Sequence, residues 1–444
     1  MRDLRKQALE SHKTMSRKAR SKIASGNSSV AGSRTASRNV SRAPSDEGDD
    51  GYLSDETAWS TNSLDDILNG EDVNISEEQW KSELNVRIEQ ITNLKRSTTE
   101  GRTASFAAYA YIIMARFANE EIEPQIRELL QSMLRSIRQE TTPSETIKAL
   151  KALAATIVTL DTGDVYEDVS GELKRAIQSE SGEVQANAIH CLGVAAFFGG
   201  AGEDEIKDIM TLFLGIVESD GASVDAPDNG SVVTAALESW GLLATDIDDL
   251  QEETEAAIEA FVDQLESSDA GVQIAAGENI ALLYEKSYTA QEEDEEIEPE
   301  WVNEDHPEFV KGASKLVNRY QVYRNQSKLL QTLDDLATVS SRRISKKDRR
   351  TLHSTFTDIR NSVEKPSRGP GYSTVISETG RVYGAGRMRV RINNSLELKI
   401  DEWWKLIRFN AARRTLQGGF AHHWEYNETV SSALPFSVNR RAKH

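Results

Sequence analysis

The chain has 444 residues, of which 38% are hydrophobic and 28% are charged, and this composition excludes a wholly disordered protein. Its most apolar stretch, residues 106–115, is about half of the roughly 20 residues that a membrane-spanning helix needs, so we expect no membrane partner. The only cysteine, Cys191, excludes an internal disulfide framework and a cysteine-based zinc site. Because Cys191 lies in an apolar run, we expect a buried thiol.

The net charge of −20 is distributed very unevenly along the chain. Residues 1–45 contain 11 basic and 2 acidic residues, residues 46–340 contain 20 and 61, and residues 341–444 contain 21 and 9. The chain is therefore an acidic body with two basic ends. Contact with nucleic acid is expected at these ends alone, although a basic tail is also typical of a nuclear-import signal.

Residues 1–75 are rich in Ser, Gly, Asn, Arg and Asp and carry almost no periodic apolar residues. Such a segment buries too little surface to offset its ordering entropy, so we expect a disordered N-terminal arm. Three serines in the arm each follow an arginine by three positions, and phosphorylation would lower the local charge by about 1.5 to 2 units per site. These candidate phosphorylation sites are Ser37, Ser41 and Ser45.

From residue 79 to residue 340 the apolar residues follow a helical period, and four segments can be superimposed. A period near 40 residues with small residues on one helix face is typical of armadillo or HEAT units, whose helices approach closely. The sequence predicts an all-α fold with an armadillo-like α-solenoid, and a compact helical bundle is the alternative. The shared positions are Ala149, Ala188, Ala236 and Ala276, followed five residues on by Ala154, Gly193, Gly241 and Ala281.

Local signals place elements within and after this array. Thr142, Pro143 and Glu145 predict an N-cap, a first helical residue and a capping-box glutamate. The acidic run 291–305 predicts an exposed loop, or a patch for a basic partner. Two further helices, at about 307–320 and 324–340, are expected to cap the end of the array.

The composition changes sharply at residue 341, so we expect a small basic C-terminal domain over residues 341–435 and a basic tail over 436–444. This domain is expected to begin with a cluster of cations, followed by a helix that contains Phe356 and Ile359. Cations on one helical face would follow a phosphate backbone, although an import receptor also recognises a short basic cluster. The cluster consists of Arg342, Arg343, Lys346, Lys347, Arg349 and Arg350.

Glycine and proline break helix and sheet, so residues 365–387 predict a flexible basic loop. The next segments, 388–392 and 396–400, alternate with period two and predict a small β-hairpin that presents Arg389 and Arg391 on one face.

Asp401 is expected to cap a helix that continues to about Gln417. Trp403 and Trp404 are expected to anchor the hairpin and this helix as a small core, with stacking on unpaired bases as the alternative. Adjacent His422 and His423 lack metal-ligand spacing, so no metal site is expected. The helix adds three candidate nucleic-acid contacts, Arg408, Arg413 and Arg414.

No phosphate loop, nucleophile elbow or metal-spaced cysteine set is present in the sequence. We therefore expect no enzymatic activity, catalytic residue, cofactor or small-molecule substrate.

Several of these segments resemble the interferon-related developmental regulator family. The similarity covers residues 80 to 444, and the segments keep the family's serial order. The resemblance is carried by Ile274 to Glu285, Val184 to Ala186, Cys191 to Phe198, Leu237 to Leu243, Ser345 to Arg350, Phe356, Asp358, Ile359, Trp404, Leu416 to Phe420 and His423.

The resemblance implies an armadillo-like region followed by a small basic domain, without catalysis. Members of the family are described as ribosome-binding factors and as transcriptional co-regulators in histone-deacetylase complexes. The charge layout favours a scaffold that binds ribosomes or ribosomal RNA through its basic ends and represses or stores the translation machinery. We expect this scaffold to be a monomer in cytoplasm and nucleus. The alternative is a co-regulator that recruits a nuclear corepressor through the solenoid. A nuclear-transport adaptor is a third possibility, resting on fold analogy alone.

Overall fold

The computed structural model describes residues 73–93, 98–160, 163–291, 316–338, 346–376, 382–386, 388–391, 396–435 and 438–440. Residues 1–72 of the predicted arm, with Ser37, Ser41 and Ser45, and nearly all of the acidic run 291–305 lie outside these residues. The arm was predicted to continue to residue 75, but a helix begins at Val73. The description that follows concerns the compact unit that begins at residue 54.

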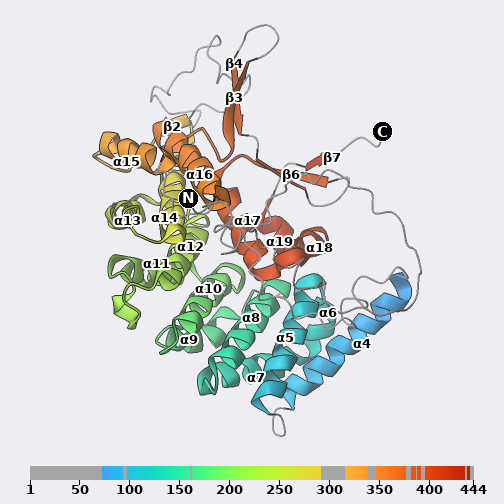
Figure 1. Cartoon of the computed structure of the whole chain (residues 1–444). Coiled ribbons are helices and arrows are strands. Elements are labelled where there is room, and N and C mark those ends of the chain that lie inside the picture. The colour runs from blue at the N-terminus through green and yellow to red at the C-terminus, as the bar shows by residue number, and fades with distance from the viewer. Residues whose placement is uncertain are drawn as a thin grey trace, which may run out of the picture. The chain divides into compact units, whose positions relative to one another are not determined.

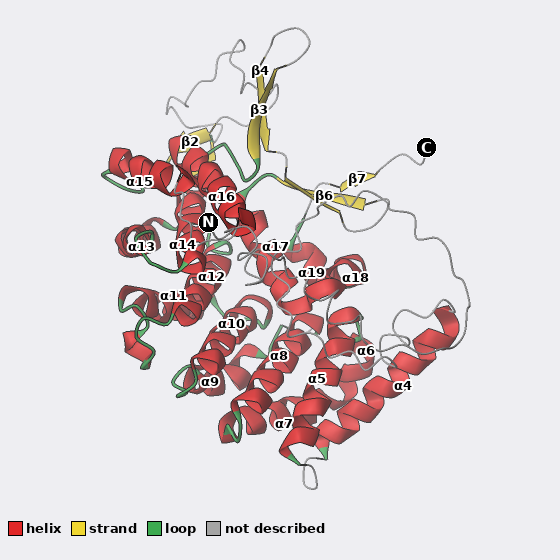
Figure 2. Cartoon of the chain, in the orientation of Figure 1, coloured by secondary structure: helices red, strands yellow, loops and turns green. Residues whose placement is uncertain are grey.

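Most of this unit is a stack of helix pairs (Figures 1 and 2), as predicted for an all-α solenoid. The second helix of each pair packs on the second helix of the next, and these helices form the inner face. The first helices, on the outer side, are α4 (Val73–Thr92), α7 (Ile126–Gln139), α9 (Tyr166–Ala176), α11 (Glu203–Glu218), α13 (Gln251–Gln264) and α15 (Gln326–Thr338). The inner helices are α5 (Thr99–Ala115), α8 (Pro143–Thr159), α10 (Gly182–Phe198), α12 (Gly230–Ala244), α14 (Ala270–Lys286) and α16 (Lys346–Glu364). Short turns of helix are α6 (Asn119–Ile122), η3 (Glu123–Gln125) and η4 (Ala222–Val224).

The small residues of the repeat lie where inner helices meet. A Cβ atom on Gly193 would be 2.9 Å from the Cβ of Ser239, and one on Gly241 would overlap the amide oxygen of Asn279. Asn279 is held there because its Nδ2 donates to the carbonyl oxygen of Leu237 at 2.8 Å. The close approach that the small residues predicted is therefore confirmed for α10, α12 and α14.

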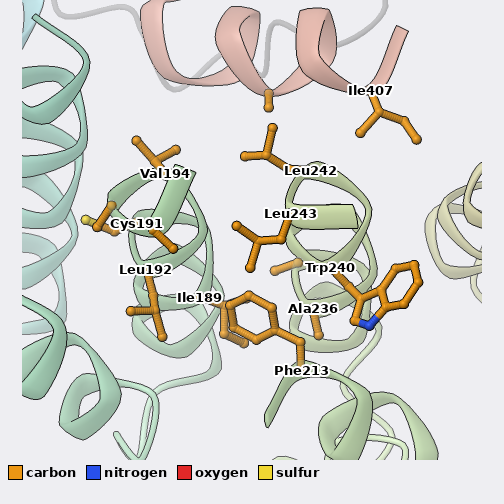
Figure 3. Packing of buried hydrophobic residues seen from close by; sticks show 14 of the residues in the cluster. Ile189, Cys191, Leu192, Val194, Phe213, Ala236, Trp240, Leu242, Leu243 and Ile407 are labelled. Atoms are coloured by element: carbon orange, nitrogen blue, oxygen red, sulfur yellow. The ribbon is translucent and has the colours of Figure 1, made fainter. Parts of the chain in front are cut away.

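Apolar side chains between the inner and outer helices form a continuous core (Figure 3). Trp240 of α12 is 1% exposed and meets Phe261 of α13 edge to face, with ring centroids 4.8 Å apart. Cys191 is buried, as predicted, and burial raises the pKa of its thiol. Figure 3 also shows Ile407 of a later helix lying above α12, so the core continues into the C-terminal segment.

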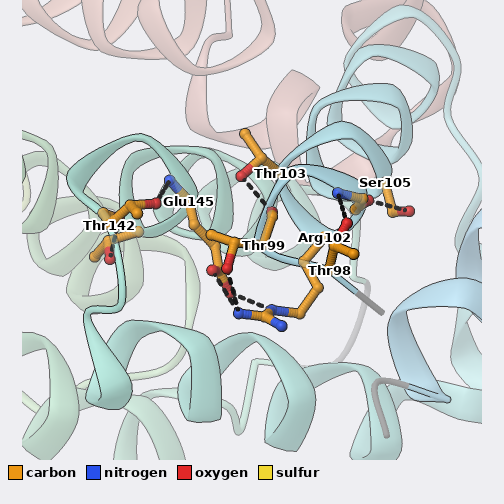
Figure 4. Close-up of polar contacts among 9 residues, drawn as sticks. Thr98, Thr99, Arg102, Thr103, Ser105, Thr142 and Glu145 are labelled. Atoms are coloured by element: carbon orange, nitrogen blue, oxygen red, sulfur yellow. Dashed lines mark hydrogen bonds and ion pairs between the residues drawn. The ribbon is translucent and has the colours of Figure 1, made fainter. Parts of the chain in front are cut away.

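A buried ion pair joins the first two inner helices (Figure 4). Thr142 caps α8 as predicted, because its hydroxyl accepts from the backbone N–H of Glu145 at 3.3 Å. The carboxylate of Glu145 binds Arg102 of α5 instead of forming the predicted capping box, with Nε to Oε1 at 2.7 Å and Nη2 to Oε2 at 2.9 Å. A buried carboxylate is stabilised more by a bidentate guanidinium than by a backbone amide that water can reach.

The prediction of a helix over 307–320 is wrong at its carboxyl end. Strands β1 (Tyr288–Ala290) and β2 (Leu316–Asn318) pair antiparallel, with Thr289 opposite Val317. Val317 is buried, and its β-branched side chain favours the extended backbone. Residues 307–315 lie outside the described part, whereas α15 confirms the helix predicted at 324–340.

The predicted domain boundary at residue 341 falls inside the last helix pair. Helix α16 pairs with α15 and packs on α14 in the manner of the other inner helices. A Cβ atom on Gly277 would be 2.7 Å from the Ile359 side chain, so the small-residue contact extends to this pair. The change of charge at residue 341 suggested a boundary, but the buried Phe356 and Ile359 continue the solenoid through Glu364.

Two small sheets follow the solenoid. The interval 365–387, predicted as a loop, contains a hairpin of β3 (Tyr372–Ile376) and β4 (Val382–Gly386), whose β-branched and tyrosine residues favour strands. The hairpin predicted at 388–400 is confirmed by β5 (Met388–Arg391) and β6 (Leu396–Ile400), with Val390 opposite Leu398. Strand β7 (Val438–Arg440) of the predicted tail pairs with β6.

The last described helices are α17 (Trp403–Leu416), the turn η5 (Gln417–Gly419), α18 (Phe420–Tyr426) and α19 (Glu428–Ala433). They lie across the inner helices of the solenoid, and Figure 1 shows them in red along its inner face. We call residues 403–434 the clasp. Its buried Trp403, Phe409 and Phe420 belong to the same core as the solenoid.

Candidate nucleic-acid interface and the closed inner face

The residues predicted to contact nucleic acid lie on different elements of the structure. Arg342 and Arg343 lie outside the described residues. Arg389 and Arg391 lie on β5, and of these two residues only the backbone is described. Arg408, Arg413 and Arg414 all lie on α17, within the clasp. The first five residues of α16 include Lys346, Lys347, Arg349 and Arg350, whose side chains are outside the described part.

The basic start of α16 is far from the clasp. Trp403 bonds the ends of both α14 and α16, since its backbone N–H donates to Glu285 and its Nε1 donates to Ser362 at 2.7 Å. Sixteen residues separate Ser362 from Lys346, which corresponds to about 24 Å at ~1.5 Å per helical residue. The cations at the start of α16 therefore lie at the opposite edge of the solenoid.

Arg408 is engaged with the solenoid. Its Nε donates to the Thr245 hydroxyl at 2.8 Å, its Nη2 to the Thr245 carbonyl at 3.0 Å, and its Nη1 to the carbonyl of Ala433 at 3.0 Å. The guanidinium also lies against the rings of Phe197 and Trp404, at 4.9 and 5.1 Å from their centroids. Thr245 follows the last residue of α12, where a cation is favoured by the helix dipole.

Arg414 meets a charged row on the inner face. The row consists of the residues two positions after each repeat alanine: Lys151, His190, Glu238 and Glu278. Arg414 Nη2 is 2.7 Å from Glu238 Oε1, and its Nη1 is 3.2 Å from His190 Nδ1. Burial, followed by Arg414 and Lys151, lowers the pKa of His190 well below its ordinary value. Burial and the neighbouring Glu238 raise the pKa of Glu278 to about 8, although Arg414 opposes this shift.

Ser239, His190 and Glu238 are arranged like a catalytic triad, but their geometry does not support one. Ser239 Oγ and Glu238 Oε2 are each 3.5 Å from a ring nitrogen of His190. Ser239 is 2% exposed and packs on Gly193, and the lowered pKa of His190 makes it a weak base. Ser239 therefore belongs to the packing between α10 and α12.

Glu285, and not Asp401, caps α17. The N-cap position is occupied by Glu402, whose side chain makes no capping bond. The Glu285 carboxylate on α14 instead accepts from the backbone N–H groups of Trp403 at 2.6 Å and Trp404 at 3.1 Å. Asp401 pairs with Lys399 and Lys405, at 3.0 and 2.7 Å. Two lysines compete for Asp401, which explains why the local prediction failed.

The second half of the clasp is fixed to the first inner helices. The Asn427 side-chain amide donates to the Val158 carbonyl at 2.8 Å, and His423 Nε2 is 2.8 Å from the carbonyl oxygen of Ile113. Burial lowers the pKa of His423 to about 4, so the ring is neutral and donates to that carbonyl. His422 Nδ1 accepts from the Phe117 N–H at 3.3 Å. Within the described ranges no group of three or more potential ligands could hold a metal ion.

The described surface offers little apolar area to a partner. The only large hydrophobic residues found exposed among the described residues are Val86 on α4 and Tyr426 on α18. Extended apolar patches usually mark stable protein–protein interfaces. None of the described helices is long and apolar enough to cross a bilayer.

Sequence reasoning missed the residues that receive the clasp. Thr245 and Glu285 occupy the same place in their repeats, nine residues after Ala236 and Ala276, so the repeat register contained the signal. No local pattern in α17 indicated which surface it would contact.

The fold and its inner surface define an α-solenoid whose concave face is covered by its own C-terminal helices. The chain belongs to the interferon-related developmental regulator family, whose model matches residues 53–364, ending with the last residue of α16. Interferon-related developmental regulator 1 of Sus scrofa and of Homo sapiens are each 22% identical over 376 residues, covering 81% of this chain and 73% of theirs. An uncharacterized protein of Schizosaccharomyces pombe is 25% identical over 361 residues, covering 81% of this chain and 75% of its own.

Proposed function

We propose that the protein is a non-enzymatic scaffold that binds ribosomal RNA on ribosomes through its basic elements and holds the translation machinery in a repressed or stored state. The start of α16 and strand β5 are the elements that make this contact. The observation that carries the proposal is the separation of charge. A cluster of cations lies at the start of the last inner helix, α16, whereas the rest of the solenoid is strongly acidic.

The place of these cations in α16 supports an anionic partner. Positive side chains at a helix N-terminus oppose the helix dipole, at a cost of about 0.3–1 kcal/mol each. Lys346, Lys347, Arg349 and Arg350 all lie in the first five residues of α16. A phosphate backbone would interact favourably with both the cations and the free N–H groups of that first turn.

The covered inner face favours RNA over a corepressor as the partner. Solenoids commonly bind proteins along their concave side, and here the clasp occupies that side. The described outer surface has no extended apolar patch. A corepressor would have to bind a polar outer surface, whereas RNA binding needs charge of the kind that α16 and β5 carry.

The experiment is sucrose-gradient sedimentation of the tagged full-length protein with ribosomes at low and high salt. Deletion of residues 341–444 would remove core residues, so point variants are used. Glutamine at Lys346, Lys347, Arg349 and Arg350 should abolish salt-sensitive co-migration with ribosomes. The matched control replaces four exposed cations of the outer helices, Arg127, Arg135, Lys174 and Arg175, and should co-migrate as the wild type does. Wild-type protein that sediments as a light, nuclease-insensitive species would favour the co-regulator function.

A further inference from the structure

One register of the repeat touches the clasp at the carboxyl ends of four successive inner helices. The residues nine positions after the repeat alanines are Val158, Phe197, Thr245 and Glu285, which we call the inner row. Each contacts the clasp: Val158 through Asn427, Phe197 and Thr245 through Arg408, and Glu285 through the start of α17. Contact at one register per repeat is how a solenoid binds an extended ligand along its axis.

The chemistry of the inner row is matched to the clasp. Glu285 presents a carboxylate to the N-terminus of α17, where the helix dipole favours an anion. Thr245 offers a carbonyl and a hydroxyl to the fork of donors on Arg408. Val158 offers a carbonyl to the amide of Asn427, which is itself buried. Each contact satisfies a group that would otherwise lose its hydrogen bond on burial.

The fit is also steric, at the point where the clasp turns. A Cβ atom on Gly419 would overlap the Met114 carbonyl oxygen and lie 2.7 Å from the Cα of Ala115 in α5. A Cβ atom on the neighbouring Gly418 would meet nothing within 4 Å. Of these two glycines, only Gly419 lies where the backbone of the clasp touches the backbone of the solenoid.

We propose that the inner row is the ligand-binding row of the solenoid and that the clasp is its resident ligand. While the clasp is docked, the concave face is closed to partner proteins, and a partner helix that used this face would first have to displace residues 403–434. The closure is a property of the free protein and does not depend on what the basic elements bind.

Hydrogen exchange of the free full-length protein, read by mass spectrometry, tests this closure. The first N–H groups of a helix are ordinarily unprotected, but Glu285 accepts from those of Trp403 and Trp404. Glu285→Ala should speed exchange of these two amides at least tenfold, and Asp401→Ala, which removes a carboxylate outside the cap, should leave them protected. Equal protection in wild type and Glu285→Ala would overturn the role of the inner row.

A pair of glycine variants tests whether the clasp covers the inner face. Gly419→Ala should speed exchange at least tenfold both in residues 403–434 and in the inner-face turns of α5 and α8. Gly418→Ala should match the wild type. Faster exchange in the clasp with unchanged exchange in α5 and α8 would show that the face is not closed by it. If Gly419→Ala fails to fold, Arg408→Gln takes its place. Exchange is then measured in residues 403–434 and in the inner-face turns of α10 and α12.

Discussion

At the scale of single residues, glycines of the same helical fold have opposite roles according to their neighbours. Gly241 faces Asn279 across the contact of α12 with α14, whereas Gly215 in α11 has nothing within 4 Å of an added Cβ. Gly241→Ala should lower the free energy of unfolding by about 1–3 kcal/mol, because a methyl group would displace the buried Asn279. Gly215→Ala should raise it by about 0.5–1 kcal/mol. Urea denaturation measures both, and shifts of the same sign would contradict the packing described for Gly241.

The ion pair of Arg102 with Glu145 gives a second prediction for single residues. The Glu145 side chain is 1% exposed, so Arg102→Met should cost about 3–5 kcal/mol by leaving a buried carboxylate without its partner. The double variant with Glu145→Met should recover most of that loss, because no charge remains buried. Chemical denaturation of the four proteins in this cycle gives the coupling. A double variant as unstable as the sum of the two single variants would contradict it.

Glu278 predicts a pH dependence. The pKa of Glu278 is raised from 4.5 to about 8, so the folded protein retains a proton that the unfolded chain loses. The free energy of unfolding should therefore fall as the pH rises from about 4.5 to about 8, by at most about 1.4 kcal/mol per pH unit from this group. Glu278→Gln should flatten the stability profile in that window. A profile as steep as that of the wild type would show that Glu278 is ionised in the fold.

At the scale of elements, the sequence predicted the helices and strands whose residue pattern lies within the element itself. The alanine and glycine register predicted the stacked helices, and alternation around residues 393–395 predicted the hairpin of β5 with β6. The hairpin of β3 with β4 was hidden because Gly384 and Gly386, which suggested a loop, lie within a strand. The cap on α17 could not be predicted, because Glu285 lies 118 residues from Trp403. Arg408 was predicted to contact nucleic acid, and in the structure it bonds Thr245, which lies 163 residues away in sequence.

The position of Arg408 gives a prediction about α17. Arg408→Met leaves the carbonyl of Ala433 without its donor and the carbonyl of Thr245 with Lys286 alone, so it should lower the free energy of unfolding by about 2–4 kcal/mol. Arg413, which lies over the Phe409 ring, provides the comparison, and Arg413→Met should cost under about 1 kcal/mol. Thermal and urea unfolding measure both losses. Equal effects would mean that Arg408 does not hold the clasp.

At the scale of the whole molecule, the proposed function gives the cations of the clasp and those of the basic elements two different tasks. Arg408 donates hydrogen bonds to the Thr245 carbonyl, and Arg414 pairs with the carboxylate of Glu238 on the inner face. The cations in the first five residues of α16 lie about 24 Å along this helix from Ser362, the residue that the clasp contacts. The division predicts that variants of α17 lower stability, whereas variants at the start of α16 lower RNA affinity and raise stability, because they remove cations that oppose the helix dipole.

The most direct measurement of this division is the salt dependence of binding between the full-length protein and purified ribosomes. Each phosphate neutralised contributes about 0.7–0.9 to the slope of log affinity against log salt concentration. Replacing Lys346, Lys347, Arg349 and Arg350 with glutamine should reduce that slope by about 3, while the four outer-helix replacements at Arg127, Arg135, Lys174 and Arg175 leave it unchanged. An unchanged slope in the α16 variant, or an equal reduction in both, would contradict RNA binding by the basic start of α16.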